Sequence, residues 1–233
     1  KLKKYKNLNN NYKIFNTEII VSDELSPISA LKKGKDSSMW KSIQAQIDHK
    51  ADITLSAGNT GVLLVMSKMI LKTLENVDKP ALAGLWPNEK NMNVVLDLGA
   101  NIDCSEKNLI DFSEMGSALF KSIFPDDTPK VSLLNIGLEE MKGTELLKTT
   151  FLKLKEISKL GDFKFNGYIE GNQITKGESN VIVTDGFTGN VALKTAEGTA
   201  NFITSELKNA LTSTTIGKIS SFMNIKNLSE FKK

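Results

Sequence analysis

The fold is decided by the stretch Asp52-Ile-Thr-Leu-Ser-Ala-Gly-Asn-Thr-Gly61, which is followed directly by the apolar run Val62-Leu-Leu-Val-Met66. This pattern predicts an apolar strand that runs into a small turn, and the turn opens a helix. Gly58 and Gly61 allow the backbone to approach a ligand closely, and a polar residue between them can cap the helix. Free N–H groups at the start of a helix favour an anion. One such corner is ordinary in α/β proteins. It indicates a ligand site only if the same pattern recurs elsewhere in the chain.

The same corner recurs three times along the chain. The other signature stretches are 93–101, 131–137 and 181–190, each an apolar run that ends in a polar turn with glycine. Further strands are predicted at 19–21, 81–85 and 165–169, and helices at 40–49, 61–74, 106–123, 144–158 and 191–211. Alternation of strands and helices predicts an α/β fold with a mostly parallel sheet and helices on both faces.

All four turns lie at the carboxyl ends of predicted strands, where open parallel sheets bind ligands. We therefore expect them to meet in one cleft, although each polar residue can also be explained as a cap or turn residue. Lys35, Lys142 and Lys194 can hold an anion. Asp97 and Asp185 can order the backbone or accept a proton. The hydrogen-bonding side chains of the four turns are Ser56, Asn59, Asp97, Asn101, Asn135, Glu139, Glu140, Lys142, Asp185 and Asn190.

The composition excludes several classes of function. All 30 basic residues among the 233 are Lys and the net charge is +3, which argues against bidentate recognition of nucleic acid. Cys104 and His49 are the only residues of their types, so a disulfide framework, a Cys/His metal site and a Ser-His-Asp triad are not expected. Scattered carboxylates leave Mg²⁺ open, but none has metal-loop spacing. We expect an intracellular α/β enzyme whose substrate carries phosphate or another anion.

Four motifs together resemble, in order and spacing, the bacterial phosphate acyltransferase family of phospholipid synthesis. They are Ser56-Ala-Gly-Asn-Thr-Gly61, Asp97-Leu-Gly-Ala-Asn-Ile-Asp-Cys104, Asn135-Ile-Gly-Leu-Glu-Glu-Met-Lys-Gly143 and Asp185-Gly-Phe-Thr-Gly-Asn-Val-Ala-Leu-Lys-Thr-Ala-Glu-Gly198, preceded by Lys35-Asp-Ser-Ser-Met39. The resemblance covers about residues 14–212. It implies one incomplete α/β domain over 1–212, followed by a helical segment over 213–233 that makes dimer or membrane contacts.

The resemblance implies transfer of a fatty acyl group from acyl-acyl carrier protein to inorganic phosphate, without a cofactor or a metal. It also implies a homodimer, a sandwich like that of isocitrate and isopropylmalate dehydrogenases, and a cytoplasmic enzyme that can lie at the inner face of the membrane. Phosphate is itself the nucleophile in this reaction, so the protein needs only to position it and to stabilise the developing charge.

The resemblance also suggests roles for individual residues. The Ser56–Gly61 turn and Lys142 are expected near phosphate, and Asn101, Asp185 and Asn190 are expected to shape the thioester site. Lys142, Asp185 and Asn190 are the candidate catalytic residues. The candidate substrate-binding residues are Ser56, Gly58, Asn59, Thr60, Gly61, Asp97, Asn101, Asn135, Glu139 and Lys194.

Departures from the family pattern lie at the two ends of the chain. Family members begin with a strand that bears an Asp-Gly-Gly-Asp type motif and finish with a Lys-His-Gly segment, and neither occurs here. The resemblance therefore implies a chain truncated at both ends. Near the end, an interrupted apolar stripe fits dimer packing, which we favour, or contact with a membrane surface. Its residues are Phe202, Ile203, Leu207, Leu211, Ile216, Ile219, Phe222 and Met223.

Three other functions compete with this interpretation. A phosphotransacetylase-like enzyme would use acyl-CoA in place of acyl-acyl carrier protein. A dehydrogenase of the related fold would need clustered carboxylates for a metal and Arg for a polycarboxylate, and the chain has no Arg. A non-catalytic fragment would only dimerise or bind acyl carrier protein.

Overall fold

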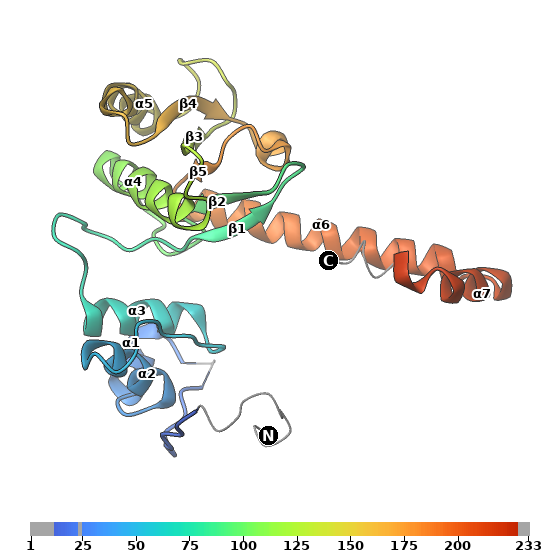
Figure 1. The fold of residues 1–233 in the computed structure, drawn as a ribbon, viewed down its shortest axis with the longest axis horizontal. Coiled ribbons are helices and arrows are strands. Elements are labelled where there is room, and N and C mark those ends of the chain that lie inside the picture. The colour runs from blue at the N-terminus through green and yellow to red at the C-terminus, as the bar shows by residue number, and fades with distance from the viewer. Residues whose placement is uncertain (1–11, 23–24, 228–233) are drawn as a thin grey trace. The chain divides into compact units, whose positions relative to one another are not determined.

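The computed structural model describes residues 12–22 and 25–227, which belong to two compact units, Lys1–Pro80 and Ala81–Lys233 (Figure 1). The predicted boundary between 212 and 213 falls inside the second unit and stays a prediction. Each unit has its own hydrophobic core, so each is described by itself.

The first unit contains three helices, α1 (Pro27–Lys33), α2 (Ser38–Ile47) and α3 (Thr60–Leu71). Each begins at a side-chain cap, because Ser26, Ser37 and Asn59 accept a hydrogen bond from the backbone N–H three residues further on. The helices enclose a small core of Ala30, Met39, Ile43, Val62 and Met66. Two of these residues, Val62 and Met66, are the only buried ones on α3.

The strands predicted at 19–21 and 52–56 are wrong for the structure as described. Neither segment pairs with another strand among the described residues of the first unit. The side chains of Ile53 and Leu55 are 72% and 87% exposed. The Thr54 hydroxyl donates to the carbonyl of Ser42 at 3.1 Å. A strand forms only where a neighbour supplies the ladder of hydrogen bonds, and an apolar run alone does not provide one.

The second unit is built on a five-stranded sheet in the order β1-β2-β5-β3-β4. The four strands from β2 to β4 are parallel, and β1 pairs with β2 antiparallel. The strands are β1 (Gly84–Pro87), β2 (Met92–Leu96), β3 (Lys130–Leu134), β4 (Lys164–Ile169) and β5 (Val181–Val183). The predicted α/β class with a mostly parallel sheet is therefore confirmed.

Helices cover both faces of this sheet (Figure 1). On one face, α4 (Glu106–Ile123) and α5 (Glu145–Ile157) pack over Val94, Val131 and Val181. Val95 follows Val94 on β2, and Ile182 follows Val181 on β5. Both point to the other face of the sheet, where they pack against residues from later in the chain. Successive side chains of a strand point to opposite faces, so the continuous apolar runs are explained by double coverage.

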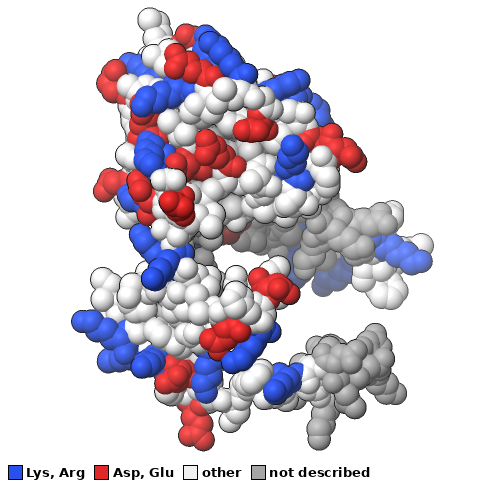
Figure 2. All heavy atoms as spheres, turned by 60° about the vertical axis from the view of Figure 1, so that its left-hand side comes forward, with Lys and Arg blue, Asp and Glu red and all other residues white. Residues whose placement is uncertain are grey.

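One ion pair joins α4 to α5, and a second lies within α4. The Nζ of Lys153 on α5 lies 2.5 Å from a carboxylate oxygen of Glu106 on α4, and Lys107 pairs with Asp111 at 2.8 Å. The side of the molecule that carries these helices comes forward in Figure 2, where basic and acidic side chains are interspersed. Such exposed pairs contribute little to stability, so the apolar contacts hold the helices on the sheet.

The last helices form a hairpin. Helix α6 (Gly186–Thr212) extends beyond the sheet, and α7 (Thr215–Met223) lies beside its far end (Figure 1). Helix α6 begins five residues earlier than the predicted start at 191, because Asp185 caps it. Most of the apolar stripe is exposed, with Phe202 and Phe222 at 66% and 76%, whereas Leu211 is half-buried. Among the described residues, no helix is long and apolar enough to cross a membrane.

Candidate functional site

The Asp97 corner (residues 97–101) follows β2 and is organised by one buried carboxylate. Asp97 is 0% exposed. Its Oδ1 accepts hydrogen bonds from the backbone N–H groups of Leu82 (3.0 Å), Gly99 (3.2 Å) and Ala100 (3.0 Å). Its Oδ2 accepts from the backbone N–H and the side-chain Nδ2 of Asn101, at 2.7 and 2.8 Å. With five donors on its two oxygens, this carboxylate fixes the shape of the loop.

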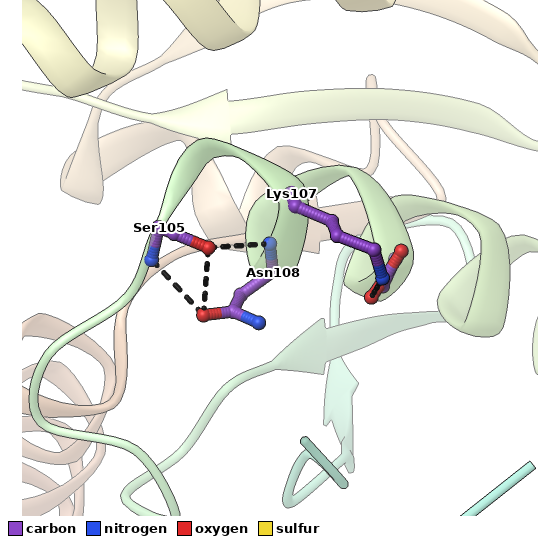
Figure 3. Close-up of polar contacts among 4 residues, drawn as sticks. Ser105, Lys107 and Asn108 are labelled. Atoms are coloured by element: carbon purple, nitrogen blue, oxygen red, sulfur yellow. Dashed lines mark hydrogen bonds and ion pairs between the residues drawn. The ribbon is translucent and has the colours of Figure 1, made fainter. Parts of the chain in front are cut away.

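The chain leaves the Asp97 corner through a capped helix start. Ser105 Oγ accepts from the backbone N–H of Asn108 at 3.3 Å, and Asn108 Oδ1 accepts from the N–H of Ser105 at 3.0 Å (Figure 3). This reciprocal arrangement is a capping box. Just before it, the Cys104 thiol donates to the carbonyl of Asn101 at 3.5 Å and packs against the core. The direction of the loop is therefore set at both of its ends.

The Asp185 corner (residues 185–190) follows β5 and forms the first turn of α6. Asp185 caps the helix, since its Oδ1 accepts from the backbone N–H of Thr188 and its Oδ2 accepts from the hydroxyl of Thr188, both at 2.8 Å. The sequence predicted an open turn here. The structure shows that the glycines of the motif lie inside the helix, and that the first-turn N–H groups of Gly186 and Thr188 donate to Asn101 and Asp185.

The Asp97 and Asp185 corners interlock. The N–H of Gly186 donates to the carbonyl of Asn101 at 2.8 Å. A Cβ on Gly189 would collide with the carbonyl of Asp97, so only glycine allows α6 to approach this closely. A Cβ on Gly99 would lie 3.3 Å from the Cβ of Asn190. Two turns that are far apart in the sequence are therefore one rigid unit.

Two candidate residues of this unit remain open to solvent. Asn190 is exposed at the end of the first turns of α6. Lys194 follows four residues later, so the two side chains share one helix face. The ammonium of Lys194 lies 2.7 Å from Glu197 in an exposed ion pair. Both residues can contact a ligand from solution.

The Asn135 corner (residues 135–143) follows β3 and is closed by its own first residue. Asn135 is 8% exposed; its Nδ2 donates to the carbonyl of Lys142 at 3.1 Å and its Oδ1 accepts from the N–H of Ile136 at 2.8 Å. Gly143 has a φ of +89°, and a Cβ there would collide with Asn135 Oδ1. Glu139 and Lys142 are exposed on the outer side of this loop, both beside Gly137.

Three of the four predicted corners share one sheet edge. Strands β2, β5 and β3 are parallel neighbours, with Leu96 opposite Val183 and Val183 opposite Leu133. Their carboxyl ends therefore lie side by side, and the Asp97, Asp185 and Asn135 corners follow directly. Convergence of the fourth corner with these three stays a prediction, because it belongs to the first unit.

That fourth element, the Ser56 corner (residues 56–61), opens the first turn of α3. Asn59 Oδ1 accepts from the N–H of Val62 at 3.1 Å, and Ser56 Oγ accepts from the N–H of Gly58 at 3.1 Å. A pocket of about 420 Å³ is lined by residues 56–59 of this corner, by Ser37 and Ser38 at the start of α2, and by apolar side chains that include Ile19, Val21 and Leu55. Thr60 and Gly61 begin α3 next to it. Two helix starts with hydroxyl side chains therefore open onto one pocket, an arrangement that suits an anion.

The serines of this pocket were absent from the candidate residues. Ser37 and Ser38 belong to the motif Lys35–Met39, which the sequence had already connected with a helix start. The sequence therefore indicated a helix start at these serines, but it did not show that α2 and α3 begin side by side. Lys35 is exposed nearby in the sequence. In the described part of the chain, no cluster of three or more His, Cys, Asp or Glu could hold a metal.

A tyrosine on β4 lies near the Asn135 corner. Tyr168 is 6% exposed, and its hydroxyl has no hydrogen-bond partner among the described residues. Its ring packs against Phe151 of α5, with the ring centroids 4.8 Å apart. Burial raises the pKa of Tyr168, and the negative charge of Glu140 raises it further.

The fold and the corners together define an α/β protein with polar turns gathered at the carboxyl edge of a mostly parallel sheet. The structure is similar to EutD phosphotransacetylase from Staphylococcus aureus, with a TM-score of 0.54 over 83% of this chain and 70% of that chain. The sequences are 15% identical, so this similarity concerns the fold alone, which is the isocitrate dehydrogenase-like fold. The family model described as "Fatty acid synthesis protein" matches residues 1–233. The chain therefore belongs to this family, the bacterial phosphate acyltransferases.

Relatives of known name support the family assignment. The chain is 62% identical over 221 residues to phosphate acyltransferase from Pelagibacter ubique, which covers 95% of this chain and 66% of the relative. It is 44% identical over 203 residues to phosphate acyltransferase from Agrobacterium fabrum, with coverages of 87% and 57%. The chain thus spans less than two thirds of the length of these relatives.

Proposed function

We propose that this chain carries the acyl-transfer site of an enzyme that moves a fatty acyl group from acyl-acyl carrier protein to inorganic phosphate. One observation carries the proposal: three motifs of the family resemblance are the three corners at one edge of the sheet. The named relatives, one of them 62% identical, are phosphate acyltransferases. The products would be acyl phosphate and free carrier protein, and the acyl phosphate would serve phospholipid synthesis.

The proposed reaction needs no nucleophile from the protein. A phosphate oxygen attacks the thioester carbonyl carbon, a C–O bond forms, the C–S bond breaks, and the carrier thiol leaves with a proton. Lys142 would neutralise phosphate, and the N–H of Phe187 in the first turn of α6 would offer a hydrogen bond to negative charge. Asn190 and Asn101 would orient the thioester. Asp97 would act through the loop it holds, because both of its oxygens already accept hydrogen bonds.

The direct test is product formation by the purified chain. The chain is incubated with acyl-acyl carrier protein and phosphate, and acyl phosphate is trapped with hydroxylamine and identified by mass spectrometry. Lys142→Ala should lower kcat/KM for phosphate by about a hundredfold. Lys164→Ala is the matched control, because Lys164 is an exposed lysine at the amino end of β4, the opposite edge of the sheet. Equal activity of the two variants would contradict the role of Lys142.

The fold similarity to a phosphotransacetylase supports a second candidate, transfer from acyl-CoA to phosphate. The same assay with acyl-CoA discriminates between the two donors. We expect acyl-acyl carrier protein to be used at least tenfold better, and the opposite preference would favour the second candidate. Binding of acyl carrier protein without any product, measured by calorimetry, would favour a non-catalytic chain.

We also propose that the chain forms a homodimer through the α6–α7 hairpin. The support is the exposed apolar stripe, in which Phe202, Phe222 and Met223 are 66%, 76% and 79% exposed. Sedimentation velocity should show a dimer, and Phe222→Asp should convert it to a monomer. Flotation with vesicles of anionic lipid tests the alternative occupant, a membrane surface. Flotation of a chain that stays monomeric would replace the dimer by a peripheral membrane contact.

A further inference from the structure

The Asn135 corner carries three charged side chains on one short turn. Glu139, Glu140 and Lys142 are all exposed. The backbone N–H of Lys142 donates to the carbonyl of Glu139 at 2.9 Å, so residues 139–142 form a tight turn. Opposite charges this close attract each other. An ion pair between Lys142 and a carboxylate of its own turn would occupy the ammonium group that the proposed chemistry gives to phosphate.

The structure shows a different pairing. The carboxylate of Glu140 lies 3.2 Å from the Nζ of Lys155, which belongs to α5. Glu139 lies beside Gly137. In the described part of the chain, Lys142 forms no ion pair. The acidic residue nearest to Lys142 in the sequence is thus directed to α5, and the ammonium of Lys142 is open to solvent.

Packing on the core fixes the position of Lys155. Its Nζ lies 5.7 Å from the centroid of the Phe151 ring, one turn earlier on the same helix, which is a cation–π contact. Phe151 is 7% exposed, and its ring packs against Phe165 and Tyr168 of β4. Burial raises the pKa of Tyr168 and the charge of Glu140 adds to this effect, which agrees with a carboxylate on the α5 side of the turn. The ammonium of Lys155 is therefore held where Glu140 can meet it.

We propose that Lys155 is a positioning residue that keeps Glu140 away from Lys142 and so keeps the Lys142 ammonium available to an anion. The inference rests on the proposed function, which assigns phosphate to Lys142, and adds a residue that does not touch the substrate. Without Lys155, Glu140 can turn to Lys142, and only the chains in which it does not do so bind phosphate. The apparent affinity for phosphate then falls by that fraction, while the bound complex is unchanged.

Kinetics with phosphate as the varied substrate give the first test. Lys155→Met removes the charge and keeps the aliphatic stem over Phe151. Because exposed ion pairs are weak, KM for phosphate should rise by about three- to fivefold, with kcat unchanged. Lys155→Arg keeps the ion pair and should behave as the unsubstituted chain. Lys153→Met is the matched control, because Lys153 is an exposed lysine of α5 whose ion pair is with Glu106 of α4.

Glu140→Gln separates this role from a merely structural one. If the ion pair only fastened the turn to α5, Glu140→Gln would raise KM as much as Lys155→Met, and the double variant would be no better. We expect instead that Glu140→Gln does not raise KM, and that Glu140→Gln with Lys155→Met returns KM to within about twofold of the unsubstituted chain. In the Lys142→Ala background, Lys155→Met should have no further effect. Equal losses in the two single variants and the double variant would overturn the proposal.

Phosphate binding can also be followed without turnover. The NMR shifts of the backbone amides of residues 137–143 are recorded during a titration with inorganic phosphate, and Kd should change in the same order as KM. If this order appears and no acyl phosphate forms, the role of Lys155 stands and the proposed function is contradicted. If product forms and Lys155→Met binds phosphate as tightly as Lys153→Met, the proposed function stands and the inference is overturned. No saturable shift at this corner in the unsubstituted chain would also overturn the inference.

Discussion

The Ser56 corner and the interlocked Asp97 and Asp185 corners share one sequence pattern, an apolar run followed by a polar turn with glycine. They differ in the hydrogen bonds that hold each turn in place. The interlocked pair follows strands that are hydrogen-bonded to neighbours on both sides, and a buried carboxylate with five donors holds it. The Ser56 corner follows an extended segment that has no partner strand among the described residues, and its leading Leu55 is 87% exposed. A motif thus specifies a turn, while the sheet around it decides how rigid the turn is.

The largest difference is expected from the residue that organises each corner. Asp97→Ala leaves four backbone N–H groups without their acceptor, and the free energy of unfolding of the second unit should fall by about 4 kcal/mol. Ser56→Ala removes an acceptor from one exposed N–H, which water replaces, so we expect about 0.5 kcal/mol. Urea titration measures both, with Trp40 fluorescence for the first unit and Trp86 for the second. Similar losses would show that the two corners are equally rigid.

The next largest difference is expected at the glycines. Gly189→Ala pushes a methyl group into the carbonyl of Asp97 and should lower the free energy of unfolding by about 3 kcal/mol. The new methyl group of Gly58→Ala meets the terminal methyl of Met39 at 2.8 Å, which can move aside, and Ser56 Oγ at 3.5 Å, which is an ordinary contact. We expect a loss below about 1 kcal/mol there. Gly198→Ala, with no atom within 4 Å, should stabilise α6 by about 0.5–1 kcal/mol in the same titration.

Removal of a helix cap should have the same effect on stability in both regions. Ser105→Ala and Asn59→Ala each remove a side chain that accepts an N–H at a helix start, and each should lower the free energy of unfolding by about 1 kcal/mol. Hydrogen exchange of the first-turn amides of α4 and α3 measures the effect locally. No change at α3 would mean that its first turn is already frayed in the unsubstituted chain.

The smallest effect is expected from Tyr168 near the Asn135 corner. Its raised pKa means that the folded chain holds the phenolic proton more tightly than the unfolded chain. Stability from this group is therefore complete below the unfolded pKa of 10.0 and falls as the pH rises above it. Tyr168→Phe should remove that dependence and change the free energy of unfolding at pH 7 by less than about 1 kcal/mol, because the hydroxyl has no partner among the described residues. Thermal unfolding between pH 8 and 11 measures both effects, and an unchanged alkaline slope would contradict the assignment.

Sequence reasoning succeeded where a local pattern and its surroundings agreed. Helix α4 was predicted at 106–123 and found there, because Ser105 caps it and its apolar residues face the sheet. It failed at 52–56, where the missing element is a partner strand. It also placed the start of α6 at 191, since Gly186 and Gly189 suggested a turn. Their reason is contact with the Asp97 corner, and such a contact between distant segments is not visible in one sequence.

The candidate site shows the same limit. The polar residues at the ends of β2, β3 and β5 could be predicted from the strand and turn pattern, and the structure places all three groups at one edge. Which of these residues hold the backbone and which are free to contact a ligand could not be predicted. Asp97 looked like a ligand contact, yet its oxygens are occupied by the backbone. Burial and hydrogen-bond partners decide this, and neither can be read from residue type.

The strand order sets the sequence of events during synthesis. Strand β5 is three residues long and lies between β2 and β3, although it is made last. Without β5, the pairs β1–β2 and β3–β4 share no hydrogen bonds in this strand order, and the inner edges of β2 and β3 have no partner. Closing such long-range pairs is slow and leaves those edges open to chaperones and to aggregation. The three corners at the carboxyl edge of the sheet can therefore meet only after β5 has paired with both of its neighbours.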